Sequence, residues 1–93
     1  MYWYVYILKC NDGLFYCGIT KNLKNRISEH NKGMCITTSK RRPVILVWSE
    51  NFIFQKAARL MEEKIKSQGP RRFLYSKLNI LKKIKNKNLS DIV

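Results

Sequence analysis

Residues 4–30 read YVYILKCNDGLFYCGITKNLKNRISEH, and this segment decides the fold. Aromatic and β-favouring residues alternate over residues 1–9, which predicts a strand with Val5 and Ile7 on one face and tyrosines on the other. A second strand of similar composition is expected at residues 14–20. The segment therefore predicts a β-hairpin with one apolar face and one face rich in hydroxyl groups.

The turn over residues 11–13 sets the register of this hairpin. If all three residues form the loop, with Gly13 at positive φ, Tyr6 pairs with Gly18 and Tyr16 lies on the same face. A two-residue loop would shift the pairing and separate the two tyrosines. We expect the three-residue loop, because only that register gathers the hydroxyl groups and leaves the other face for a core.

A helix is expected to follow the hairpin over residues 23–31, with Asn22 as its N-cap. Arg26 and His30 are four residues apart, so they lie on the same side of this helix. We expect both side chains to reach the same edge of the sheet.

The second half of the chain predicts one more strand and further helices. Val44–Trp48 is a continuous apolar run, which is typical of a central strand buried on both faces. A helix is expected over residues 54–67, ended by Gly69-Pro70. On this helix Glu62 lies beside the apolar stripe, whereas Glu63 points to water.

Composition predicts one basic domain over residues 1–93, with a third helix from Arg71 or Arg72 and a basic tail at 82–93 that frays. A net charge of +13 favours a polyanionic partner, with nucleic acid first and an anionic membrane second. No signal peptide or membrane span is recognisable, and three cysteines without a CxxC pair fit the cytoplasm. The residues expected to contact phosphates are Lys40, Arg41, Arg42, Arg71 and Arg72.

Several of these residues, in this order, resemble the motifs of GIY-YIG nuclease domains, especially the small stand-alone bacterial type. The resemblance covers about residues 2–66 and rests on this set: Tyr4-Val5-Tyr6, Tyr16-Cys17-Gly18, Arg26, His30, Arg42-Pro43 and Glu62. Tyr4 stands where the first motif has glycine. The resemblance implies an α+β fold, a three-stranded antiparallel sheet flanked by helices, and phosphodiester hydrolysis on the tyrosine face.

The same residues suit that chemistry. Mg²⁺ or Mn²⁺ is often held by one or two carboxylates and water, so Glu62 alone is an adequate protein ligand. Arg26 is expected to donate to the phosphate oxygens. Tyr16 is expected to hydrogen-bond the phosphate or the nucleophile, and Gly18 to leave room for close approach.

The general base remains open between two residues. An unperturbed tyrosine has a pKa near ~10, so Tyr6 is a poor base unless nearby cations lower that value. His30 is the alternative, either as the base or as the group that orients Tyr6 or water. Many relatives carry a further tyrosine or histidine before the third strand, where this chain has residues 36–39, ITTS.

The expected function is a Mg²⁺-dependent endonuclease that cuts DNA, in preference to RNA, with little sequence specificity. A protein partner is expected to supply any specificity. Six acidic residues and one histidine are too few for carboxylate-rich two-metal sites or paired-histidine chemistry. Two alternatives stand beside it: a nucleic-acid-binding module without strong catalysis, and a basic protein associated with RNA or ribosomes.

Overall fold

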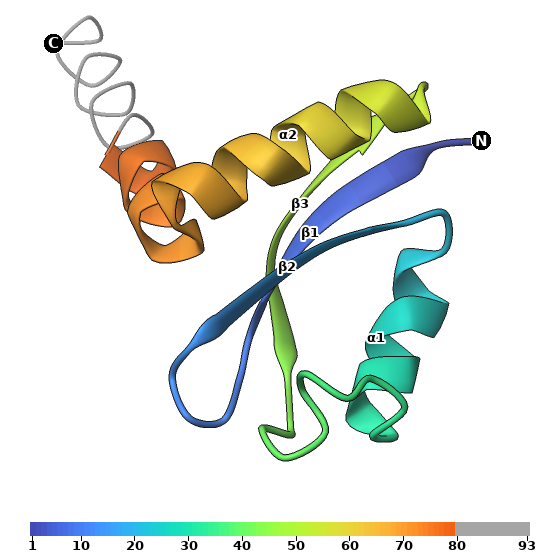
Figure 1. Ribbon diagram of the computed structural model, residues 1–93, viewed down its shortest axis with the longest axis vertical. Helices are drawn as coiled ribbons and strands as arrows, with labels where there is room; N and C mark the ends of the chain where they lie inside the picture. Colours follow the sequence, from blue (N-terminus) through green and yellow to red (C-terminus); the bar gives the residue numbers. More distant parts are fainter. Residues whose placement is uncertain (80–93) are drawn as a thin grey trace, which may run out of the picture.

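The chain forms one three-stranded antiparallel sheet with helices on its two faces (Figure 1). A computed structural model describes residues 1–79. In chain order the elements are β1 (Trp3–Lys9), β2 (Phe15–Thr20), α1 (Leu23–Asn31), β3 (Ile45–Phe52), α2 (Gln55–Gln68) and a last helical stretch over residues 70–79. This architecture confirms the expected α+β class. The predicted basic tail at 82–93 lies outside the described residues.

The β1–β2 hairpin has the register of a three-residue loop. Tyr6 pairs with Gly18, and Leu8 pairs with Tyr16. Gly13 has a φ of +85°, a conformation that glycine adopts without a steric penalty. Because these pairs share one face, the expected gathering of Tyr6 and Tyr16 on one side of the sheet is confirmed.

The central strand is β1, so the assignment of Val44–Trp48 as a strand buried on both faces was wrong. β3 is an edge strand that pairs only with β1 among the described residues, and the sheet order is β2-β1-β3. Ile45 is 58% exposed and Val47 is 39% exposed. Residues 5–8 are all buried, because β1 is covered on both faces. An apolar run signals β structure, but it does not say which strand has neighbours on both sides.

Two apolar clusters lie on opposite faces of the sheet. The cluster under α2 and the last helical stretch contains Val5, Ile7, Cys17, Ala58, Ile65 and Phe73. The cluster on the α1 side contains Tyr6, Leu8, Cys10 and Val44, with Tyr16, Leu23 and Ile27 packed against it. In Figure 1, α1 and α2 lie on the two sides of the strands. The tyrosine face is therefore the face that α1 covers.

The helix ends follow the sequence signals closely. The Asn22 side chain accepts a hydrogen bond from the backbone N–H of Asn25 at 3.1 Å, which is a cap worth about 1 kcal/mol. α2 stops at Gln68, where Gly69 takes a φ of +100°. Within the described part of the chain, no helix has the length and apolar character needed to cross a membrane.

Candidate active site

Three of the predicted site residues form one hydrogen-bonded group. The Tyr6 hydroxyl oxygen on β1 lies 3.1 Å from Nε2 of His30 on α1. Nε of Arg26, one turn earlier on α1, donates to the same hydroxyl at 3.4 Å. The i, i+4 spacing of Arg26 and His30 thus places both side chains on one phenol oxygen.

Tyr16 completes this group from the neighbouring strand. Its ring centroid is 4.9 Å from that of His30 in an edge-on arrangement and 6.3 Å from that of Tyr6. The side chain is only half-buried, and burial raises the pKa of Tyr16 above its ordinary value. At neutral pH Tyr16 therefore presents a protonated hydroxyl next to the imidazole.

The four side chains divide into a buried pair and a pair that meets solvent. Tyr6 is 1% exposed and His30 is 0% exposed, whereas the Arg26 side chain is 32% exposed. Burial raises the pKa of Tyr6 to about 12, although the hydrogen bond from Arg26 acts in the opposite direction. Burial, and then the positive charge of Arg26, lower the pKa of His30. Both buried groups are therefore neutral at pH 7, and of the four side chains Arg26 and Tyr16 are the ones that meet solvent.

Gly18 makes room for a protein side chain. A Cβ atom at this position would lie 2.5 Å from the Tyr6 hydroxyl oxygen and 2.7 Å from its Cζ. The space that we expected to admit a substrate is thus occupied by the Tyr6 phenol. Because Gly18 has no side chain, the Tyr6 phenol can lie directly against β2.

Glu62 does not join this group. It lies on α2, between Ala58 and Ile65 of the apolar cluster on the opposite face of the sheet. Its carboxylate forms an ion pair with Lys66 at 3.3 Å, and its side chain is 17% exposed. The helical period correctly placed Glu62 beside the apolar stripe and Glu63 in solvent. Our expectation that the acid shares one pocket with the tyrosines is not met by this arrangement.

Glu62 and the Tyr6 group lie on the two faces of the sheet next to the same edge strand, β2. Cys17 is buried beneath α2, where burial and then the Glu62 charge raise its pKa to about 11. Its neighbours on β2, Tyr16 and Gly18, face α1 because successive residues on a strand alternate. β2 is at the edge of the sheet. The Glu62 carboxylate and the Tyr6 group therefore lie on opposite faces of the sheet.

The donor set around Glu62 is compatible with a divalent ion held mainly by water. Mg²⁺ keeps several waters and often takes only one or two carboxylates from the protein. Among residues 1–79 no cluster of three or more acidic, histidine or cysteine ligands occurs, so Glu62 would act largely alone. Lys66 pairs with the carboxylate through a side chain that is 57% exposed, and exposed ion pairs of this kind are weak.

Two of the arginines expected on phosphates are engaged within the protein. Arg41 donates from Nε to Asp12 at 2.7 Å, and Arg42 donates from Nε to the Ser39 carbonyl oxygen at 2.7 Å. The Lys40 side chain is exposed and forms no ion pair within the described residues. Of this run, Lys40 is the cation best placed for a phosphate.

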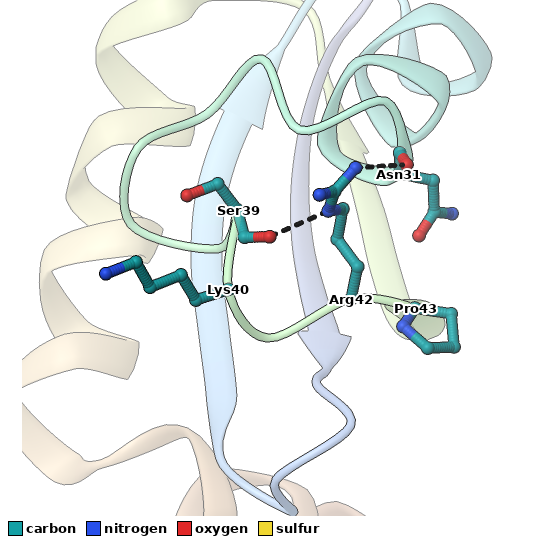
Figure 2. Close-up of a pocket in the computed structure, with 5 residues that line it drawn as sticks. All are labelled: Asn31, Ser39, Lys40, Arg42 and Pro43. Atoms are coloured by element: carbon teal, nitrogen blue, oxygen red, sulfur yellow. Dashed lines mark hydrogen bonds between the residues drawn. The ribbon is translucent and has the colours of Figure 1, made fainter.

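This run helps to line an open pocket of about 620 Å³. In Figure 2 the Lys40 side chain points away from Arg42. The pocket is lined by Asn31, Ser39, Lys40, Arg42 and Pro43. Arg71 and Arg72 are exposed and border another hollow with Tyr75. Arg71 also lines a further hollow together with Arg41, so the two basic runs are neighbours at that point.

Thr38 is the site residue that sequence reasoning missed. Its hydroxyl oxygen lies 2.8 Å from Nδ1 of His30, and its side chain is fully buried. Residues 36–39 carry neither the tyrosine nor the histidine that many relatives have there, so no motif marks this loop. A threonine in a loop has no period that marks it as buried, so the contact was not predictable from spacing.

We predict that stability falls as pH drops through the range in which His30 would charge. The unfolded chain binds this proton near pH 6.5, whereas the native chain binds it only at lower pH because burial and Arg26 oppose the charge. The unfolding free energy is therefore fully retained above about pH 6.5 and decreases below it, with a slope approaching about 1.4 kcal/mol per pH unit. Urea titrations between pH 7.5 and 5 measure this slope.

His30 is the only histidine in the chain, so a variant at this position removes the whole histidine contribution to the pH dependence. His30→Gln is expected to be less stable at pH 7.5 but to lose the extra slope between pH 6.5 and 5. An unchanged slope in this variant would assign the titration to another group.

Comparison with known proteins places this geometry in a family. The GIY-YIG catalytic domain matches residues 2–79. The UPF0213 protein of Desulfotalea psychrophila is 47% identical over 73 residues, which cover 75% of this chain and 66% of that protein. The UPF0213 protein of Staphylococcus haemolyticus is 45% identical over 65 residues, covering 69% and 79% of the two chains.

A solved structure agrees with these matches. The solution NMR structure of the UPF0213 protein BH0048 from Bacillus halodurans has 35% identity, a TM-score of 0.52, and coverage of 88% of this chain and 86% of that one. The match spans slightly less than two thirds of the D. psychrophila protein and 61% of its counterpart in Nitratidesulfovibrio vulgaris. With the family match running from the first strand to the last described helix, the chain belongs to the GIY-YIG catalytic domain family, whose fold is that of a nuclease.

Proposed function

We propose that the protein is an endonuclease that hydrolyses DNA phosphodiester bonds with little sequence specificity and requires Mg²⁺ or Mn²⁺. The observation that carries this proposal is the contact of Tyr6, His30 and Arg26 on one phenol oxygen, with Tyr16 beside them. Proton acceptors and a guanidinium so close together are what hydrolysis of a phosphodiester needs.

Tyr6 and His30 act together as the proton acceptor. Forming a tyrosinate at pH 7 against a pKa of about 12 costs roughly 7 kcal/mol, so Tyr6 is a poor base alone. In a relay, the attacking water gives a proton to the Tyr6 oxygen while the Tyr6 proton moves to Nε2 of His30, 3.1 Å away. The phenol then stays neutral, and the imidazolium carries the charge.

Arg26 and Tyr16 bind the phosphate. Arg26 uses Nε on Tyr6, which leaves its terminal nitrogens, loosely paired with Glu29 at 3.7 Å, to donate to phosphate oxygens. Such charge-assisted hydrogen bonds stabilise the charge that develops on the phosphate as water attacks. Water forms the new P–O bond, the bond to the leaving oxygen breaks, and the Tyr16 hydroxyl donates to a phosphate oxygen.

Glu62 is the residue that would hold the divalent ion. The ion, when bound, would supply positive charge to the phosphate and to the leaving oxygen. The protein prepares this by keeping the Glu62 carboxylate at the border of the core, 17% exposed and balanced by Lys66.

The proposed partner is DNA in preference to RNA, bound through the phosphate backbone. The net charge of +13 supplies nonspecific attraction, and the exposed Lys40, Arg71 and Arg72 provide local contacts. Phosphate contacts position a duplex without reading bases, so a separate protein partner would supply any sequence choice.

The proposal is tested by incubating the protein with single-stranded, nicked and branched DNA, and with matched RNA, in Mg²⁺ or in EDTA. Cleavage of DNA that requires the ion is expected, together with binding that weakens steeply as salt rises. Binding without cleavage of any substrate would contradict the proposed endonuclease activity. Preferential cleavage or binding of RNA would show that RNA, not DNA, is the partner.

A second function, a nucleic-acid-binding module without strong catalysis, is favoured by one observation. Glu62 is paired with Lys66 and lies across the sheet from Tyr6, as a structural ion pair would. In that case the tyrosine group would serve the core of the domain, and only the basic surfaces would act. The same assay separates the two functions, because this module binds all the substrates and cuts none.

Glu62→Gln is expected to lower DNA cleavage roughly tenfold at low Mg²⁺ and to be partly rescued by more Mg²⁺, because glutamine keeps an oxygen ligand but loses the charge. DNA binding in EDTA should be unchanged. Glu63→Gln, one residue along and exposed, is the matched control and should cleave as wild type does. Equal cleavage by both variants would show that Glu62 holds no ion.

A further inference from the structure

The buried Thr38 hydroxyl contacts Nδ1 of His30, the ring nitrogen that does not contact Tyr6. Oγ1 of Thr38 lies 2.8 Å from Nδ1 of His30, and neither residue is exposed to solvent. The loop holds Thr38 from both sides, because its N–H donates to the Cys35 carbonyl at 3.2 Å and its carbonyl accepts from the Arg41 N–H at 2.9 Å. The hydroxyl is therefore fixed in place by the backbone of the loop.

Counting donors and acceptors determines which His30 nitrogen carries the proton. Within residues 1–79, the Tyr6 oxygen has hydrogen-bond contacts only with Nε of Arg26 and Nε2 of His30. Arginine donates and never accepts, so the Tyr6 O–H has one acceptor, Nε2. Nε2 must then carry no hydrogen. A neutral imidazole with a bare Nε2 has its hydrogen on Nδ1, which donates to Thr38.

The Thr38 hydroxyl can accept this hydrogen bond. Its oxygen has two lone pairs and its hydrogen rotates freely about the Cβ–Oγ1 bond, so the O–H can point away while Oγ1 accepts from Nδ1 of His30. The contact between Thr38 and His30 therefore agrees with the single tautomer.

We propose that Thr38 is a positioning residue that holds His30 in the Nδ1–H tautomer, so that Nε2 accepts the proton of Tyr6. The role of this tautomer in hydrolysis rests on the proposed function. With a hydrogen on Nε2 instead, His30 would donate to Tyr6 and the relay would be blocked. When the proton moves, the O–H bond of Tyr6 breaks, an N–H bond forms at Nε2, and the imidazolium keeps its Nδ1–H bond to Thr38.

The tautomer can be read directly, because His30 is the only histidine in the chain. Long-range proton–nitrogen NMR spectra of the ¹⁵N-labelled wild-type protein at pH 7.5 distinguish the two ring nitrogens. A protonated Nδ1 and a bare Nε2 are expected. A protonated Nε2 in the wild type would overturn the proposal, whatever the variants do.

Variants then test whether Thr38 is the cause. Thr38→Val keeps the shape but removes the acceptor, so His30 is expected to shift toward the Nε2–H tautomer and kcat to fall roughly tenfold with little change in KM. Thr38→Ser should restore both. Thr37→Val, an exposed neighbour, is the control and should change neither. A Thr38→Val protein that retains the Nδ1–H tautomer would overturn the proposal.

The outcomes separate this proposal from the function on which it builds. The tautomer is measured without substrate. An Nδ1–H imidazole in a protein that cuts no DNA would therefore contradict the proposed nuclease activity and leave the role of Thr38 in fixing the tautomer intact. An Nε2–H imidazole in a protein that does cut DNA removes the role of Thr38, and with it the relay through Nε2, but leaves the nuclease activity.

Discussion

Tyr6→Phe is expected to lower the kcat for DNA cleavage by about 10²–10⁴-fold, which is the range for losing a positioned proton acceptor. The ring would remain in its buried position between His30 and Gly18, and only the hydroxyl would be lost. Binding should change little, because Tyr6 is 1% exposed and Arg26 still faces solvent. Single-turnover cleavage and a DNA-binding titration on the same preparation measure the two effects separately.

The stability of this variant also has a predicted value. Without the hydroxyl, Nε2 of His30 and Nε of Arg26 each lose a hydrogen-bond partner, and we expect a loss of about 1–3 kcal/mol in unfolding free energy. Tyr4→Phe is the matched control, because Tyr4 is on the same face of β1 but pairs with Thr20 beyond the site. If both variants cleave equally well, the relay through Tyr6 is wrong.

The tyrosine half of the site was predictable because it depends on local structure. A loop of three residues with Gly13 at positive φ fixes the hairpin register, and the register puts Tyr6 opposite Gly18. The helical spacing of Arg26 and His30 then brings both to the same phenol oxygen. Each step relates residues within 30 positions of the sequence, where periodicity and turn chemistry carry the information.

The placement of Glu62 depends on tertiary structure, which periodicity does not describe. The helical period states which side of α2 meets the sheet, but it does not state which face of the sheet α2 covers. α2 packs over Val5 and Ile7, so Glu62 lies beside Cys17 and away from Tyr6. The same limit explains the error at β3, since strand order is a property of the whole sheet.

Gly18→Ala is expected to damage both stability and catalysis. The added methyl group would lie 2.5 Å from the Tyr6 hydroxyl oxygen, and the Tyr6 side chain is itself buried. Overpacking of this kind typically costs 1–3 kcal/mol, and we expect a loss of about 2 kcal/mol in unfolding free energy. Displacing the Tyr6 oxygen by about 1 Å would lower kcat by roughly 10²-fold. Urea unfolding and single-turnover cleavage measure the two losses.

Gly13→Ala separates strain in the backbone from damage to the site. Gly13 has positive φ, but a Cβ there would have nothing within 4 Å. We expect it to lose about 1 kcal/mol from backbone strain while each folded molecule cleaves at the wild-type rate. If Gly18→Ala behaved in the same way, the contact with Tyr6 would be irrelevant to catalysis.

The double variant Tyr6→Phe/Gly18→Ala shows whether the glycine acts through the hydroxyl. Removing the oxygen removes the shorter clash and leaves the contact with Cζ at 2.7 Å. We therefore expect the double variant to lose less unfolding free energy than the two single variants lose together. The losses in kcat should also not add, because Gly18→Ala has no hydroxyl left to displace once residue 6 is phenylalanine. Strictly additive losses would mean that the two motif residues act separately. Coupled losses would mean that this pair of motif residues, brought together by one hairpin register, acts as a single unit.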